Sequence, residues 1–96
     1  MTIKQLAQTK GRVYVYLADE AIGQRFLEDL EREGFTFGDG VKPTARPMDR
    51  IYALNRNGMI NYVGFVGHLA FGSDARTIGG QPLVRVDYRE FLQQSS

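Results

Sequence analysis

Hydrophobic and polar residues alternate most clearly at residues 12–17, in the run Arg-Val-Tyr-Val-Tyr-Leu. Alternation over so short a run, with β-branched and aromatic residues, predicts a β-strand. The two valines and the leucine would share one face of the strand, and the two tyrosines would share the other. Since neither face is polar, we expect this strand to lie in the middle of a sheet, or its tyrosine face to be covered by another chain.

A period of about four residues replaces this alternation further along the chain. Ile22, Phe26 and Leu30 recur with that spacing and form one apolar stripe. Asp19 suits the N-cap and Gly34 suits the position after the last turn, so we predict a helix from Asp19 to about Glu33. The charged residues of its last turns are expected on a solvated outer face: Glu28, Asp29, Glu31, Arg32 and Glu33.

The most apolar part of the chain runs from Ile51 to Phe71 and is interrupted by Asn55-Arg56-Asn57-Gly58. Because Asn-Gly tolerates the positive φ angles of a tight reversal, we predict a β-hairpin over Ile51–Val66. Its apolar character places it in the middle of the core. The residues from His68 to Phe71 fit both a continuation of the second strand and a single helical turn.

Phe35-Thr36-Phe37 is expected to be a short strand. Because a strand, a helix and this strand follow one another, we expect a right-handed crossover that pairs it in parallel with residues 12–17. The segment Val41–Asp49 is expected to be a loop, since Pro43 and Pro47 exclude a helix.

Capping-box spacings near both ends of the chain predict a short helix or a frayed end over Ile3–Thr9 and a short helix over Tyr88–Gln94. Between the hairpin and the last helix we expect a polar loop over Gly72–Gln81 and a final strand over Pro82–Asp87. Together these elements predict one α+β domain spanning residues 1–96, with a mixed four- to five-stranded sheet and one main helix packed on a face.

The composition excludes several classes of function. The 96 residues include no cysteine, so disulfides, thiolate metal sites and thiol catalysis are excluded. The apolar stretch Met59–Phe71 is shorter than the roughly 18 residues of a membrane span, and the first residues lack a secretory apolar segment. We therefore expect a cytoplasmic protein that makes no membrane contact and needs no cofactor.

The net charge of +1 offers no general attraction for nucleic acid. The charges are nevertheless unevenly distributed. Residues 1–40 carry five Lys/Arg and seven Asp/Glu, whereas residues 41–96 carry seven and four. The second part could therefore hold a local anion site.

The loop from Gly38 to Arg46 is the best candidate for that anion site. Its glycines could direct backbone N–H groups at an anion, and Lys42, Thr44 and Arg46 could assist. Asp39, between the two glycines, is also predicted to be a ligand-binding residue. It is not a dinucleotide fingerprint, because Pro43 stands where the third glycine belongs, and its glycine spacing is not that of a P-loop. The alternative interpretation is an ordinary turn whose basic residues are simply solvated.

Tyrosines on the predicted strands could stack a base. Tyr52 and Tyr62, in the hairpin, are the candidates nearest the glycine-rich loop, and Arg50 or Arg85 could lie beside such a platform. The alternative is a half-buried sheet face or a dimer interface, which tyrosine also favours.

No catalytic or metal-binding arrangement stands out. His68 is the only histidine, and nothing places it with Ser73 and an oxyanion hole. Six of the eleven carboxylates lie on the predicted helix over residues 19–33, so a catalytic pair is indistinguishable from capping and surface residues. We therefore predict that the protein is not an enzyme and binds no metal.

The segments GFTFGDGVKPT and INYVGFVGHLAFG resemble a family of small, largely uncharacterised bacterial proteins associated with phages and mobile elements of Gram-positive hosts. The resemblance covers Val13 to Tyr88 and brings no site residues. It implies a context in which small proteins bind and neutralise a host component, such as a nuclease effector or a nucleotide second messenger.

Two functions follow as hypotheses. The first is a non-enzymatic module that binds a small anionic, nucleotide-like ligand through the residues named above, in a site that a homo-oligomer would help to close. The second is a protein-interaction module that binds and inhibits a host protein through the tyrosine face or a sheet edge. Nucleic acid is the weaker third candidate for a partner, given the near-neutral charge.

Overall fold

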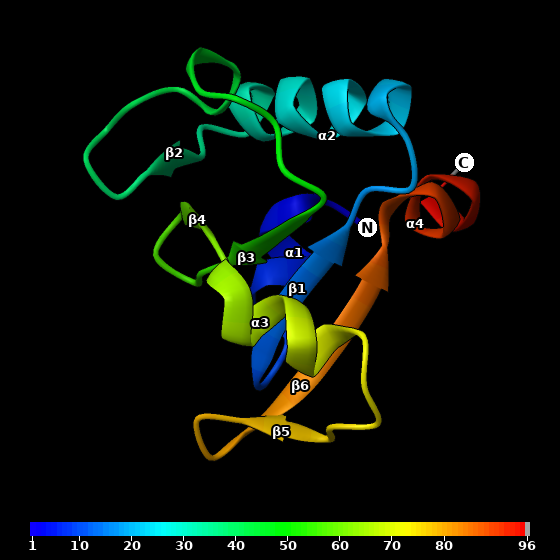
Figure 1. Cartoon of the computed structure of the whole chain (residues 1–96). Helices are drawn as coiled ribbons and strands as arrows, with labels where there is room; N and C mark the ends of the chain where they lie inside the picture. Colours follow the sequence, from blue (N-terminus) through cyan, green and yellow to red (C-terminus); the bar gives the residue numbers. More distant parts are fainter. Residues whose placement is uncertain (96) are drawn as a thin grey trace.

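The computed structural model describes residues 1–95, and the side chains of residues 1–94. One mixed sheet has the strand order β2-β4-β3-β1-β6-β5 (Figure 1). Its strands are β1 (Arg12–Tyr16), β2 (Thr36–Phe37), β3 (Ile51–Leu54), β4 (Met59–Tyr62), β5 (Thr77–Ile78) and β6 (Gln81–Asp87). The helices are α1 (Ile3–Ala7), α2 (Glu20–Arg32), α3 (Gly64–Phe71) and α4 (Tyr88–Ser95), and a 3-10 turn covers Pro43–Ala45.

The α+β class is confirmed, but the predicted strand count was too low, and the one main helix, α2, is accompanied by α1, α3 and α4. The segment predicted to be a loop over Gly72–Gln81 contains β5, which pairs antiparallel with the start of β6. Two residues form this strand, which is too short for an alternating pattern to be visible in the sequence. The segment Val41–Asp49, expected to be a loop without helix, contains the 3-10 turn. Pro43 is tolerated there because it lies at the start of the turn, where its missing N–H would have no partner.

Strand β1 is central, as predicted. It pairs antiparallel with β3 on one side and parallel with β6 on the other, with Val13 opposite Leu54 and Val84. Its tyrosine face is covered by α3 of the same chain, and Tyr14 is buried there together with Ile51, Ala53 and Leu83.

The predicted hairpin is confirmed in its first part and wrong in its second. Strands β3 and β4 pair antiparallel around the turn at residues 55–58, where Gly58 has a φ of +83°. The second strand ends at Tyr62 rather than Val66, because Gly64 adopts a φ of +67° and α3 begins there. His68 to Phe71 are therefore helical.

The predicted parallel pair between β1 and β2 is also wrong. Strand β2 pairs in parallel with β4, and both hairpin strands lie between β2 and β1. The crossover through α2 thus places β2 at the sheet edge, where it meets the hairpin's second strand instead of β1.

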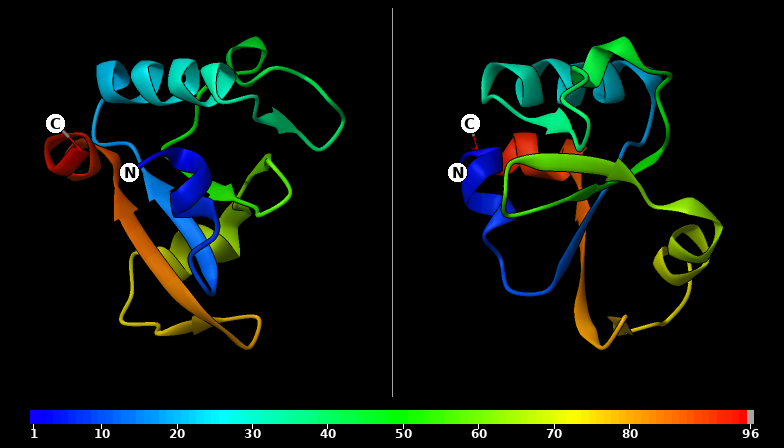
Figure 2. Two further views of the ribbon diagram at one scale, coloured as in Figure 1. Left: turned by 180° about the vertical axis from the view of Figure 1, so that it is seen from behind. Right: turned by 90° about the vertical axis from the view of Figure 1, so that its left-hand side faces the viewer.

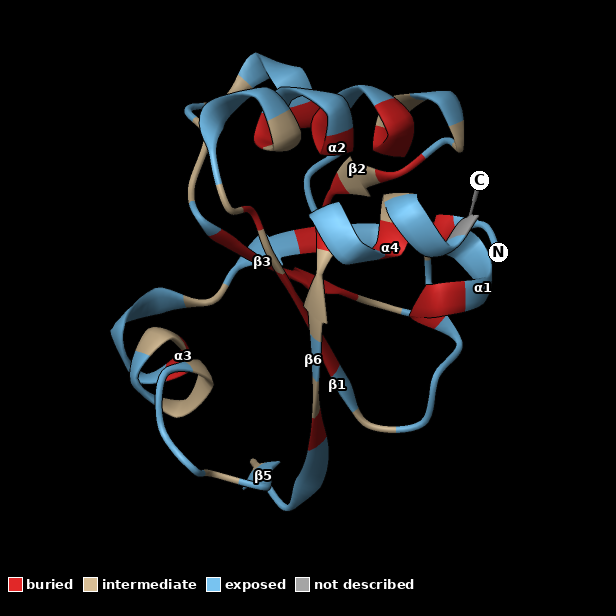
Figure 3. Cartoon of the chain, turned by 90° about the vertical axis from the view of Figure 1, so that its right-hand side faces the viewer, coloured by how far each residue is buried: buried red, intermediate tan, exposed pale blue. Residues whose placement is uncertain are grey.

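The helices cover the two faces of the sheet unequally (Figures 1 and 2). Helices α1, α2 and α4 lie on one face, where the larger core cluster forms around Val15, Phe26 and Tyr88. Helix α3 lies on the other face over the smaller cluster that contains Tyr14. Figure 3 shows buried residues concentrated in β1, β3 and the inward side of α2, and few of them in α3.

Helix α2 has the predicted bounds and the predicted stripe, with Phe26, Leu27 and Leu30 buried and the Asp19 carboxylate accepting a hydrogen bond from Ile22 N–H. One outer-face assignment is wrong, because Asp29 is buried. Its carboxylate accepts hydrogen bonds from the Tyr88 hydroxyl and from two arginine side chains of α2. Tyr88 lies 59 residues away in the sequence, so periodicity alone could not show this contact.

Candidate functional site

The glycine-rich loop over residues 38–46 is held together by its own polar side chains. The Arg46 guanidinium forms an ion pair with the Asp39 carboxylate and lies 4.7 Å from the centre of the Phe37 ring. The hydrogen bond from Arg46, followed by the one from Val41 N–H, lowers the pKa of the Asp39 carboxyl. Both candidate residues therefore already have partners within the loop.

Thr44 and Lys42 belong to a different part of the surface. Thr44 donates hydrogen bonds from both its N–H and its hydroxyl to Glu31 of α2. These bonds lower the pKa of the Glu31 carboxyl, and the Lys42 charge lowers it further. The loop is thus fastened to α2 by Thr44, one of the residues predicted to contact an anion.

The two candidate tyrosines lie side by side, with ring centroids 5.5 Å apart, but they differ in exposure. Tyr52 is fully buried, and its hydroxyl oxygen accepts a hydrogen bond from Asp49 N–H. Tyr62 is 37% exposed and donates its hydroxyl hydrogen to the Pro47 carbonyl. Tyr52 is consequently not available for stacking a base.

The six predicted residues do not share one cavity. Arg46 and Tyr62 line one shallow depression of about 540 Å³. Lys42 lines another, of about 290 Å³, together with Glu31. The tyrosine platform does not form either, because Tyr14 and Tyr88 are buried as well and Arg85 is engaged elsewhere.

His68 lies on α3 at the edge of its packed side. Its Nε2 is 3.6 Å from Asp49 Oδ2, and both side chains are more than one-third exposed. Ser73 donates its hydroxyl hydrogen to the Ala70 carbonyl, so it does not contact the imidazole as a nucleophile would. Within residues 1–95 no three carboxylate or imidazole side chains gather where they could hold a metal ion.

The most unusual surface of the molecule is the outward side of α3. Phe65, Val66 and Leu69 are 77%, 70% and 57% exposed. The sequence between Met59 and Gly72 contains no Asp, Glu, Lys or Arg, and one histidine, His68. We call these three side chains the α3 apolar surface.

The inward side of α3 explains why its larger residues point outward. Gly67 is buried against the sheet, and a Cβ there would lie 2.6 Å from the Val63 Cβ and 3.5 Å from the Tyr14 ring. Ala70 and Phe71 complete the contact with the smaller core cluster, and the Phe71 ring stacks on Tyr16 with centroids 5.9 Å apart. Gly67, Ala70 and Phe71 thus face the sheet, and Phe65, Val66 and Leu69 are left facing solvent.

Arg85 of β6 fixes the end of this helix. Its guanidinium donates hydrogen bonds to the carbonyl oxygens of Phe71, Ala70, Ser73 and Ala75, with donor–acceptor distances of 2.8 to 2.9 Å. Positive charge at a helix C-terminus also favours the helix dipole. Arg85 is therefore a structural residue rather than part of a stacking platform.

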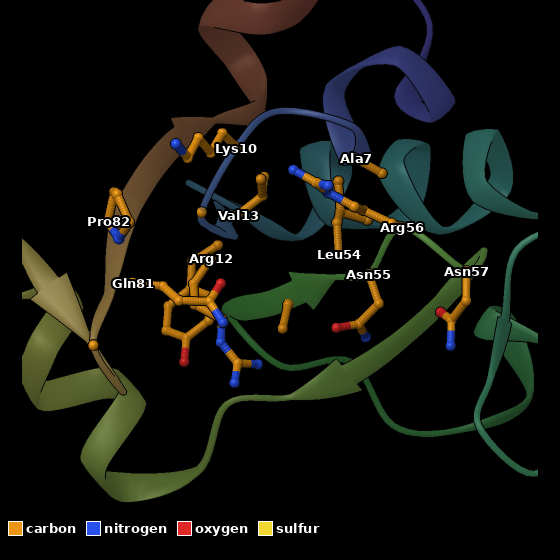
Figure 4. A pocket seen from close by; sticks show the side chains of 14 residues that line it. Ala7, Lys10, Arg12, Val13, Leu54, Asn55, Arg56, Asn57, Gln81 and Pro82 are labelled. Atoms are coloured by element: carbon orange, nitrogen blue, oxygen red, sulfur yellow. The ribbon is translucent and has the colours of Figure 1, made fainter.

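A second feature was missed in the sequence. A cleft of about 670 Å³ opens where β1 and β6 begin and β3 ends, and Figure 4 shows the side chains around it. Lys10, Arg12 and Arg56 line it. The last lies more than 40 positions from the other two, so only the pairing of β1 with β3 brings them together.

The apolar surface, by contrast, had a visible signal. The run from Met59 to Phe71 is more apolar than a two-faced strand requires, and that excess predicted burial.

Among the helices described, none has the length and hydrophobicity to cross a membrane.

Neither a protein-family model, nor a curated protein, nor a solved structure matches this chain. The candidate functions therefore depend on the two surfaces themselves.

Proposed function

We propose that this protein is a non-enzymatic interaction module and that α3 is the element that contacts its protein partner. The observation that carries the proposal is the α3 apolar surface, where Phe65, Val66 and Leu69 are each more than half exposed. Contiguous apolar groups on a monomer typically mark an interaction site. A helix that is apolar on all sides is normally buried, and here one side is not.

Contacts within the chain already hold α3 in place against the sheet. Arg85 holds its C-terminal carbonyls, and Gly67 fixes its distance from the sheet. A contact surface that is already ordered loses less conformational entropy on association than a loop would. A large aromatic side chain such as Phe65 is the kind of residue that anchors protein interfaces.

The partner that fits this surface is a protein with an apolar groove that accepts two turns of helix. The resemblance to phage and mobile-element proteins makes a host protein the partner to test first. The residues of the glycine-rich loop give less support to the competing hypothesis of a nucleotide-like ligand, because Asp39, Thr44 and Arg46 already have protein partners.

Site-specific photo-crosslinking tests the proposal. A photoreactive phenylalanine analogue at Val66 should give a discrete adduct in host lysate, whereas the same analogue at Ala21, exposed on α2, should not. An adduct of twice the chain mass would identify a second copy as the occupant instead of a host protein.

The substitutions Phe65→Gln and Leu69→Gln should lower the yield of the adduct at least tenfold. Because both side chains are exposed, each variant should keep the wild-type free energy of unfolding to within about 0.5 kcal/mol. Crosslinking that persists in both variants, or that is equally strong from Ala21, would rule out α3 as the contact element.

A further inference from the structure

Beyond the proposed interaction through α3, we infer that the cleft at the start of β1 binds the polyphosphate group of a small molecule. Its basic residues come from separate places: Lys10 from the loop before β1, Arg12 from the first position of β1, and Arg56 from the β3–β4 turn. Figure 4 shows Lys10 and Arg12 on one side of the opening and Arg56 on the other.

Strand pairing fixes this arrangement. Arg12 lies opposite Leu83 of β6, and Val13 lies opposite Leu54 at the end of β3. Gly11 permits the close approach, because it has a φ of +114° and a Cβ there would lie 2.4 Å from the Pro82 carbonyl oxygen. Strand pairing therefore fixes the backbone from which these exposed side chains extend.

The charge of the cleft is uncompensated. Its lining includes three cations and no carboxylate, and the other polar side chains are the neutral amides of Asn55, Asn57 and Gln81 and the hydroxyl of Tyr14. None of the ion pairs in the described chain involves the three cations. Five of the seven arginines outside the cleft have ion-pair or carbonyl partners: Arg25, Arg32, Arg46, Arg85 and Arg89. A cavity lined by one sign of charge attracts ions of the opposite sign.

The size and lining of the cleft select the class of anion. A volume of about 670 Å³ falls within the roughly 300–1,000 Å³ of small-molecule sites. Two guanidinium groups and an ammonium suit several adjacent phosphates better than one. The only aromatic residue in the lining, Tyr14, is 8% exposed, so recognition would rest on phosphates and not on base stacking.

Calorimetric titration of the full chain with orthophosphate, pyrophosphate and tripolyphosphate at constant ionic strength tests this assignment. Tripolyphosphate should bind at least tenfold more tightly than orthophosphate and should shift the backbone amide resonances of Gly11, Asn57 and Gly80. No saturable binding of any of the three, or equal affinity for all of them, would overturn the inference.

Matched charge variants locate the site. Arg12→Gln and Arg56→Gln should each raise the Kd for tripolyphosphate at least fivefold. Arg76→Gln removes the same charge from an exposed arginine that does not line the cleft, and it should change the Kd less than twofold. Equal effects of all three substitutions would show non-specific attraction and would refute the site.

A single-stranded oligothymidine provides the third arm. If it binds through Arg12 and Arg56 while tripolyphosphate does not, the cleft is a nucleic-acid contact and the inference is wrong. Phe65→Gln should leave tripolyphosphate affinity unchanged, because the cleft does not include α3.

Discussion

Helices α2 and α3 pack on opposite faces of the same sheet with opposite arrangements of side chains. In α2, Phe26 and Leu30 are fully buried, Ile22 is partly buried, and the outer side is polar. In α3 the buried residue is Gly67, and Phe65 and Val66 face solvent. Burial in the core explains the sequence of α2, whereas the outward side of α3 contributes little to folding. This difference is the basis for proposing α3 as a contact element, because its exposed apolar side chains are not explained by packing within the chain.

The two helices are also attached differently. Phe26 of α2 packs on the rings of Tyr52 and Tyr88, with centroids 5.8 and 4.8 Å away. The attachment of α3 depends on the Phe71–Tyr16 stack and on the Arg85 hydrogen bonds to backbone carbonyls. Apolar burial therefore dominates on one face, and a few directional contacts matter more on the other.

The largest expected effect comes from making the same substitution in both helices. Phe26→Ala should lower the free energy of unfolding by about 3–5 kcal/mol, since it leaves a cavity in the core. Phe65→Ala should change it by less than about 0.5 kcal/mol, because that ring is already in solvent. Urea denaturation followed by circular dichroism measures both. A similar loss in the two variants would show that Phe65 packs in the core and would remove the contrast.

A smaller loss is expected from Tyr88→Phe, which deletes the hydroxyl that donates to the buried Asp29 carboxylate on the α2 face. A hydrogen bond to a charged group contributes about 1.5–3 kcal/mol, and Asp29 keeps its two arginine partners. Denaturation at pH 7 measures the loss. An unchanged stability would mean that a water molecule replaces the deleted hydroxyl at Asp29 without cost.

Tyr88 should also make the stability of the wild type depend on pH. Burial, followed by the hydrogen bond to Asp29, raises the pKa of the Tyr88 phenol above its ordinary value of 10. The folded state thus retains this proton more tightly than the unfolded state, so the stabilisation is complete below about pH 10 and declines as the pH rises further. Between about pH 10 and 12 the wild type should lose stability more steeply than Tyr88→Phe. Parallel curves would contradict the assignment.

The smallest of these effects concerns the attachment of α3. Arg85→Ala removes the hydrogen bonds to four carbonyls. It should lower the free energy of local unfolding of α3 by about 1–2 kcal/mol, since the guanidinium is partly solvated. Amide hydrogen exchange should become faster in α3 and stay unchanged in α2. Arg76→Ala, which removes an exposed arginine from the neighbouring loop, is the control. Equal acceleration in both helices would show global destabilisation instead.

The elements governed by local rules were predictable. Alternation identified β1, the four-residue period and the Asp19 cap identified α2, and Asn57-Gly58 identified the hairpin turn. The end of β4 was missed because Gly64 permits both a strand bulge and a helix start, and its φ of +67° chose the second. The candidate site residues were predicted from the chemistry of their side chains alone. That chemistry does not reveal that Arg46 and Thr44 already have carboxylate partners in the folded chain.

The sequence by itself determined the α+β class, the central strand and the long helix, because each depends on neighbours a few positions apart. Only the tertiary structure decided that β2 pairs with β4, that Asp29 is buried beside Tyr88, and that Lys10, Arg12 and Arg56 line one cleft. It also decided that the apolar residues of α3 face outward. Such outcomes depend on which distant segments meet, and that is settled by the packing of the whole chain.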